Sequence, residues 1–104
     1  MGDVVPIEQP ENYALAIKRI KKLWHEGEVT WTSHVEKEMK RRKLLPSDLR
    51  HIIKTGIIVD HSRPQSHWRY EIRGQLLDGG KASCIVEING HLIVVTCYVA
   101  NRWP

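Results

Sequence analysis

The sequence has 104 residues, with 16 Lys and Arg against 12 Asp and Glu, which gives a formal net charge of +4. A chain of this length is expected to fold as one small domain, residues 1–104, and this argues against a multidomain enzyme. The fractions of hydrophobic and charged residues, 41% and 27%, are typical of a globular protein with a modest core and argue against intrinsic disorder.

Targeting and redox signals are weak in this sequence. The longest apolar run, Leu92–Val95, is far shorter than the roughly 18 residues that a membrane span needs. Residues 1–10 lack the basic and then apolar pattern of a signal peptide, so we expect a cytoplasmic protein with no membrane partner. Cys84 and Cys97 are too few for a disulfide framework, and free thiols are expected.

The positive charge is concentrated in the first half of the chain. Eleven of the 16 Lys and Arg residues fall between Lys18 and Lys54, and the pI is about 9.3. Clustered cations favour a polyanionic partner such as RNA or DNA, or an acidic protein. The alternative is that the positive charge only keeps the protein soluble and binds no particular partner.

Helices are expected in residues 10–56, after an extended lead-in over residues 1–9. The first helix has an apolar stripe at spacings of four, three and four and ends at Gly27; the stripe comprises Tyr13, Ile17, Ile20 and Trp24. The second begins at the capping box formed by Ser33 and Glu36 and runs to about Lys43. The third has Pro46 in its first turn and ends at Gly56.

Residues 57–100 are expected to form an antiparallel sheet of about four strands. Residues 68–73 alternate between apolar and charged side chains, which is typical of a half-buried strand. Residues 82–88 and 91–99 flank Asn89-Gly90 and predict a hairpin with a two-residue type I′ turn. The predicted fold is therefore α+β, with N-terminal helices packed on one face of a curved antiparallel sheet.

This turn pairs Ile88 with His91 and assigns the two faces of the hairpin. The face expected to pack on the helices comprises Ala82, Cys84, Val86, Ile88, Ile93, Val95 and Cys97. The opposite face is expected to form the floor of a shallow groove and comprises Ser83, Ile85, Glu87, Leu92, Val94, Thr96 and Tyr98.

The second predicted helix carries His34, Glu38 and Arg42 at successive i, i+4 positions along its apolar border. An imidazole, a carboxylate and a guanidinium are the groups needed to move a proton and to stabilise an anion. The alternative is a salt-bridge ladder on a solvated helix face. Of the aromatic residues, only Tyr70 and Tyr98 are expected to face a ligand.

A metal site or a cysteine nucleophile is not expected. The sequence has no paired Cys and His spacing of the kind that binds zinc. Both cysteines fall on the predicted core side of the hairpin, where a thiolate is costly.

Several short motifs resemble the bacterial family called domain of unknown function 4258, and the likeness spans Trp31 to Tyr98. The motifs are Thr32-Ser33-His34, Glu38-Met39, Arg42, Asp48-Leu49, Gly56, Trp68–Gly74 and Val94-Val95-Thr96. The sequence departs from the family pattern at Glu38, where many relatives have Arg, at Lys43, where Gly is common, and at Leu45, where a capping Ser is frequent.

That family resembles the small RelE-like and BrnT-like toxins of type II toxin–antitoxin pairs. The resemblance implies a RelE-like fold and a metal-independent endoribonuclease without a cofactor, held inactive by a cognate antitoxin. It also implies that the substrate is RNA, mRNA above all, and that the ribosome is a possible partner.

The leading hypothesis is RNA cleavage by attack of the 2′-hydroxyl on the adjacent phosphate. His34 or Glu38 is the expected base, Arg42 and Arg73 the anion-stabilising groups, and Tyr70 or His34 the acid. The expected RNA contacts are Lys37, Lys40, Arg41, Lys54, Arg69, Lys81, Thr96 and Tyr98. The alternatives are a non-catalytic basic module that binds RNA, a ribosome or an acidic protein, and a small structural or assembly protein.

Overall fold

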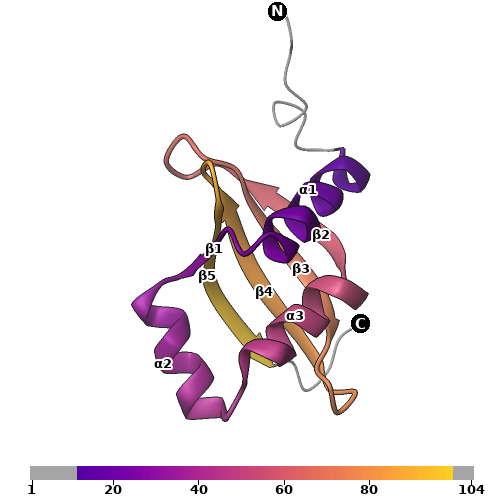
Figure 1. Cartoon of the computed structure of the whole chain (residues 1–104), viewed down its shortest axis with the longest axis vertical. Coiled ribbons are helices and arrows are strands. Elements are labelled where there is room, and N and C mark those ends of the chain that lie inside the picture. The colour runs from indigo at the N-terminus through magenta and orange to yellow at the C-terminus, as the bar shows by residue number, and fades with distance from the viewer. Residues whose placement is uncertain (1–11, 100–104) are drawn as a thin grey trace, which may run out of the picture.

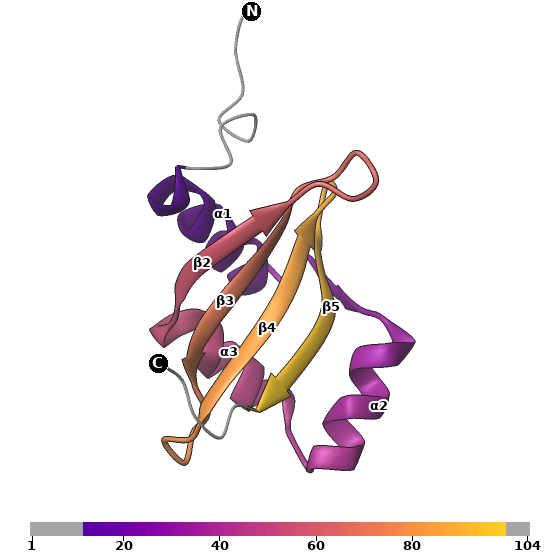
Figure 2. The ribbon, with the colours of Figure 1, turned by 180° about the vertical axis from the view of Figure 1, so that it is seen from behind.

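The computed structural model describes residues 12–99, in which α1 and α3 lie across one face of a five-stranded sheet and α2 packs beside β5 (Figure 1). The lead-in expected over residues 1–9 lies outside the described residues. Among the described residues, no helix lies on the other face of the sheet (Figure 2). In chain order the elements are α1 (Tyr13–His25), β1 (Val29–Trp31), α2 (Ser33–Arg42), α3 (Pro46–Thr55), β2 (Ile57–Ser62), β3 (Arg69–Gln75), β4 (Lys81–Ile88) and β5 (Leu92–Val99).

The strand order is β1-β5-β4-β3-β2, so the sheet has five strands where about four antiparallel strands were expected. The pairs from β2 to β5 are antiparallel as expected, whereas β1 pairs parallel with β5, with Val29 beside Leu92. No strand was predicted between the first two helices. Three residues show no period of two, and the partner strand lies about sixty residues away, so no local pattern indicates this pairing.

The helix boundaries follow from local capping chemistry. The N-cap of α2 is Thr32, one residue before the expected Ser33, and its hydroxyl accepts a hydrogen bond from the Val35 N–H at 3.1 Å. Pro46 occupies the first turn of α3, where the Asp48 carboxylate accepts a hydrogen bond from the Leu45 N–H at 3.0 Å. The three predicted helices are therefore confirmed, with ends shifted by one or two residues.

The β4–β5 hairpin is confirmed, but its register differs from the predicted one. Ile88 pairs with Leu92 rather than His91, so the turn has three residues instead of two. A bulge follows, because Val86 pairs with Val94 while Ile85 pairs with Thr96, and Val95 is the extra residue.

The bulge reverses the side on which the residues of β5 lie. Before it, Leu92 and Val94 are buried toward the helices, so the expectation that Ile93 and Val95 pack there was wrong. After it, Cys97 faces the helices as expected and lies directly opposite Cys84. A single extra residue changes the parity of the strand, and the composition of the strand gives no signal of it.

Thr32 connects the bulge to the start of α2. Its hydroxyl donates to the Val95 carbonyl oxygen at 2.7 Å while accepting from the Val35 N–H. The irregular carbonyl of the bulge therefore has a partner, and the first turn of α2 is fixed to β5.

The core lies between the helices and the sheet. The side chains that are fully or almost fully buried there include Ile20, Val35, Leu49, Ile52, Tyr70, Ile72, Val86, Leu92 and Val94. Cys84 and Cys97 are buried free thiols, and burial raises the pKa of both, so they stay neutral. The approach of α3 to β3 is close enough that a Cβ on Gly74 would lie 2.5 Å from the Ile52 carbonyl oxygen.

Replacing Thr32 by Val is expected to lower the free energy of unfolding by about 2 kcal/mol. The change keeps the shape of the side chain but removes a helix cap and leaves the Val95 carbonyl without its donor. Urea denaturation of Thr32→Val and of the control Thr32→Ser, which retains the hydroxyl, measures the effect. A Val variant as stable as the Ser variant would show that this hydroxyl does not hold the bulge.

Candidate functional site

The face of the sheet that carries no helix is here called the open face. Strand register places the charged residues of β3 on it, since Arg69 pairs with Glu87 and Arg73 with Ser83. The outward side chains of the four antiparallel strands are Ile57, Asp60, Ser62, Arg69, Glu71, Arg73, Gln75, Lys81, Ser83, Ile85, Glu87, Ile93, Thr96 and Tyr98. Polar groups from four strands therefore share one surface.

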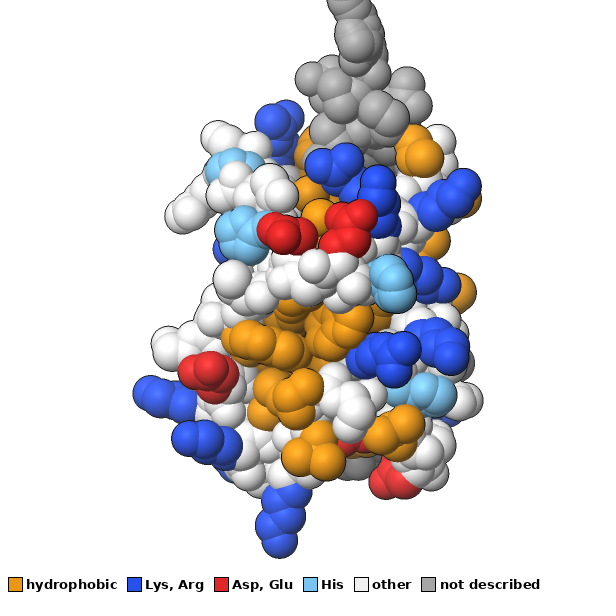
Figure 3. Space-filling view, in the orientation of Figure 1, with side chains coloured by type: hydrophobic (Ala, Val, Ile, Leu, Met, Phe, Trp, Pro, Cys, Tyr) orange, Lys and Arg blue, Asp and Glu red, His pale blue; other side chains and the backbone are white. Residues whose placement is uncertain are grey.

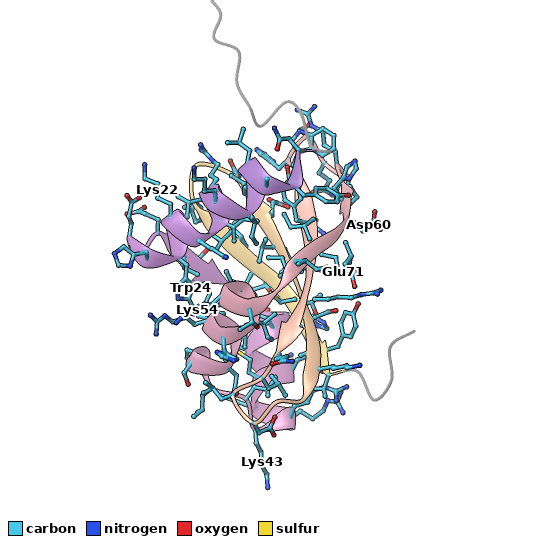
Figure 4. The ribbon with its side chains drawn as sticks, turned by 90° about the vertical axis from the view of Figure 1, so that its right-hand side faces the viewer. Lys22, Trp24, Lys43, Lys54, Asp60 and Glu71 are labelled. Atoms are coloured by element: carbon cyan, nitrogen blue, oxygen red, sulfur yellow. The ribbon has the colours of Figure 1, made fainter. Side chains whose placement is uncertain are left out.

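Glu71 is the centre of a hydrogen-bond cluster on the open face. Its Oε2 accepts from the Tyr98 hydroxyl at 2.7 Å, from Ser83 Oγ at 3.3 Å and from Arg73 Nε at 3.3 Å. The donors come from β5, β4 and β3, and Ser83 is completely buried beneath its neighbours. Figure 4 shows Glu71 and Asp60 on the side of the sheet away from α1 and α3. Within residues 12–99 all the hydrogen bonds found at this carboxylate go to Oε2, which leaves Oε1 for another donor.

A second ion pair and a small hollow lie next to this cluster. Arg69 Nε donates to Glu87 Oε1 at 2.8 Å, and the two side chains are 33% and 14% exposed. The hollow has a volume of about 80 Å³ and includes Asp60, Ser62, Arg69, Glu71 and Ile85 in its lining. Glu71 is 18% exposed, and it lines this hollow together with Arg69.

The Tyr98 phenol is held in its neutral form. Burial first, and then the hydrogen bond to the Glu71 carboxylate, raise the pKa of Tyr98 above its usual value near 10. The phenol thus keeps its proton at neutral pH and sits 2.7 Å from a carboxylate. A proton acceptor, a proton donor and a guanidinium meet on the open face, and these groups suffice for acid–base chemistry on an anionic substrate.

The residues expected to form a catalytic row on α2 are arranged differently. Glu38 accepts from Arg41 at 3.0 Å and from Arg42 at 3.2 Å, so the salt-bridge alternative is found for this part of the row. The Arg41 hydrogen bond is the main cause that lowers the pKa of Glu38, which weakens it as a base. His34 is exposed in the first turn, and eight residues of helix separate it from Arg42 by about 12 Å.

The other two expected catalytic residues lie on opposite sides of β3. Tyr70 faces the helices, is 1% exposed and packs edge-on against Tyr13 with ring centroids 6.5 Å apart. Arg73 belongs to the open-face cluster. The structure therefore does not bring His34, Glu38, Arg42, Tyr70 and Arg73 together.

The expected RNA contacts fall into three groups. Arg69, Lys81, Thr96 and Tyr98 lie on the open face, Lys37, Lys40 and Arg41 on α2, and Lys54 on α3. Glu71 and Ser83, two members of the open-face cluster, were not among the predicted site residues. For Glu71 a signal existed, because it alternates with Arg69 and Arg73 on the polar side of a half-buried strand.

No three His, Cys, Asp or Glu side chains in residues 12–99 lie close enough together to hold a metal ion. None of α1, α2 and α3 is long and apolar enough to cross a bilayer.

Comparison with known proteins places the chain in a family. The family model described as "Domain of unknown function (DUF4258)" matches residues 31–99, which include α2, α3 and strands β2 to β5. No curated protein and no solved structure matches the chain. The matched region contains the entire open-face cluster, and the chain belongs to the DUF4258 family.

Proposed function

We propose that the protein is a metal-independent endoribonuclease that cleaves RNA on the open face. The observation that carries the proposal is the Glu71 carboxylate, which accepts a 2.7 Å hydrogen bond from the Tyr98 phenol and a 3.3 Å bond from Arg73. A base, an acid and a cation are the three groups that cleavage through the 2′-hydroxyl requires. They lie on an accessible surface, whereas Tyr70 is in the core and Glu38 is engaged by two arginines.

In this proposal Glu71 takes the proton of the RNA 2′-hydroxyl as the 2′-oxygen attacks the adjacent phosphorus. The bond from phosphorus to the 5′-oxygen breaks, and Tyr98 protonates the leaving 5′-oxygen. The products are a 2′,3′-cyclic phosphate and a free 5′-hydroxyl. Arg73 stabilises the negative charge that develops on the phosphorane oxygens.

The hydrogen bond between Tyr98 and Glu71 also closes the proton cycle. After one turnover Tyr98 lacks a proton and Glu71 carries one more, and the two oxygens are 2.7 Å apart. A phenolate is a stronger base than a carboxylate, so the proton moves from Glu71 to Tyr98 across this hydrogen bond without a shuttle. Both groups are thereby restored to their starting protonation states.

A second candidate function is an RNA-binding module that breaks no bond. The observation that favours it is the pairing of Glu87 with Arg69 and of Glu71 with Arg73, because paired charges on a sheet surface also occur as ordinary structural contacts. The two candidates differ in one property, which is the ability of the protein to cut RNA in the presence of a chelator.

Replacing Glu71 by Gln is expected to lower the rate of RNA cleavage in chelator by about 10²- to 10⁴-fold, because the proton acceptor is lost while the size of the side chain is kept. Cleavage is measured with a labelled single-stranded RNA at fixed salt. The matched control is Glu87→Gln, which neutralises a second carboxylate of the open face and is expected to change the rate by less than about tenfold.

One further control and two possible outcomes separate the alternatives. An RNA that carries a single 2′-deoxynucleotide is expected to resist cleavage at that nucleotide. Equal cleavage by wild type and Glu71→Gln would contradict the assignment of the base. A wild-type protein that binds the RNA and never cuts it, alone or with ribosomes, would favour the binding module.

We further propose that this enzyme is related to the RelE-like and BrnT-like toxins and acts as the toxin of a type II pair, with an antitoxin as its partner. Support comes from the order of helices followed by antiparallel strands, which such toxins share, and from the basic charge of the chain.

Expression of the wild-type protein alone in a bacterium is then expected to arrest growth, because uncontrolled RNA cleavage stops translation. Expression of Glu71→Gln at the same level is expected to leave growth unchanged. Growth is followed by optical density, with protein levels compared by immunoblot. Arrest by both proteins would show that toxicity does not come from this carboxylate.

A further inference from the structure

Within residues 12–99, helices α1 and α3 carry a surplus of positive charge on the helix side, away from the open face. Helix α1 has four Lys or Arg side chains and no carboxylate; they are Lys18, Arg19, Lys21 and Lys22. Helix α3 adds Arg50 and Lys54, and its one carboxylate, Asp48, accepts from the Leu45 and Leu77 N–H groups in the first turn. Figure 3 shows blue side chains gathered over these two helices, on the right of the view.

The open face is balanced by comparison. Its three cations, Arg69, Arg73 and Lys81, are matched by three carboxylates, Asp60, Glu71 and Glu87. Long-range attraction of a polyanion therefore comes from the helix side.

A hollow lies between the last turns of α1 and α3. Its volume is about 140 Å³, and its lining residues are Lys21, Trp24, His25, Arg50, Ile53 and Lys54. No carboxylate is among them, whereas the larger hollow beside Arg41 and Arg42 includes both Asp48 and Asp78. The carbonyl ends of two helices contribute about half a negative charge each, which leaves the three cations of the hollow with a surplus of about two positive charges.

The chemistry of this hollow fits nucleic acid better than an acidic protein. Lysine is depleted at protein–protein interfaces, whereas interfaces with nucleic acid are strongly positive. Trp24 and Ile53 supply only a small apolar floor, and the indole is half-buried and packs edge-on against Trp31 at 5.5 Å. The large exposed hydrophobic side chains of residues 12–99 are Leu15, Leu45, Ile57, Leu77 and Tyr98, and none of them lines the hollow.

We infer that the hollow between α1 and α3 holds the phosphate backbone of the RNA whose cleavage is proposed for the open face. This inference rests on the proposed function in taking RNA as the ligand. Figure 4 shows Trp24 and Lys54 on the helix side of the sheet and Glu71 on the other side. Lys54 precedes Ile57, the first residue of edge strand β2, by three positions, so an RNA strand reaches the open face by passing around one sheet edge.

The test measures RNA binding in the Glu71→Gln background, so that the RNA stays intact and binding is separated from cleavage. The triple variant Lys21→Gln, Arg50→Gln and Lys54→Gln removes the three cations of the hollow. The control triple Arg19→Gln, Lys22→Gln and Lys43→Gln removes the same charge from positions outside it. The probe is a fluorescein-labelled oligouridylate, and binding is followed by anisotropy at several salt concentrations.

The hollow triple is expected to bind RNA at least about tenfold more weakly at low salt. Its plot of the logarithm of the association constant against the logarithm of the salt concentration is expected to be less steep by about 2, or roughly 0.7 for each lost phosphate contact. The control triple is expected to lower the slope by less than about 1. In the Glu71→Gln protein with its hollow intact, the Trp24 indole N–H and the Arg50 Nε–H resonances are expected to shift on addition of RNA.

Three results would overturn the inference. The first is equal loss of affinity in both triples, which would mean diffuse attraction. The second is unchanged binding by the hollow triple. The third is an affinity for polyglutamate of equal charge that matches the affinity for RNA, which would make an acidic protein the ligand. None of these three results depends on RNA cleavage. A failure of the proposed nuclease activity would appear only in the cleavage assay of wild type and Glu71→Gln.

Discussion

The extra residue at Val95 is the constraint on which the arrangement of the open face depends. Before the bulge, Leu92 and Val94 complete the core, and after it Thr96 and Tyr98 turn to the open face. Without the bulge the alternation of β5 would bury the Tyr98 ring under the helices and expose Cys97. The Thr32 hydroxyl holds the bulge through the Val95 carbonyl at 2.7 Å, so the start of α2 helps to decide where Tyr98 lies.

The two faces of the sheet carry different kinds of side chains. The helix side supplies the apolar core and, on the outer surface of α1 and α3, six Lys and Arg side chains with one carboxylate. The open face supplies paired charges and a phenol around one carboxylate. In the proposed function, a polyanion attracted by one side and processed on the other would account for both the net charge and the near neutrality of the open face.

Local chemistry made much of the fold predictable. Capping at the start of α2, Pro46 in α3 and Gly56 after it fix their helices through neighbours in sequence, and Asn89-Gly90 marks the hairpin. The bulge and the strand β1 were not predictable in this way. The bulge depends on Thr32, which is 63 residues from Val95 along the chain, and β1 exists only through its pairing with β5.

The open-face cluster could be predicted from the sequence only in part, because the residue types along the second predicted helix pointed to α2 and not to the sheet. His34, Glu38 and Arg42 have the right chemistry, but Glu38 is bound by arginines and His34 lies about two turns away from Arg42. The alternation of β3 already placed Tyr70 with Ile72 on the inner side and Glu71 with Arg73 on the outer side. The partners of Glu71 on β4 and β5 required the register, which no pattern within β3 specifies.

The most direct test of the account is a crystal structure of the protein with an RNA whose cleavage position carries a 2′-deoxynucleotide. The account predicts the scissile phosphate on the open face, with a phosphate oxygen in hydrogen-bond contact with Arg73, the 2′ position facing Glu71 and the 5′-oxygen near Tyr98. A scissile phosphate bound on α2 beside His34, or an open face without RNA while the RNA is bound elsewhere, would contradict it.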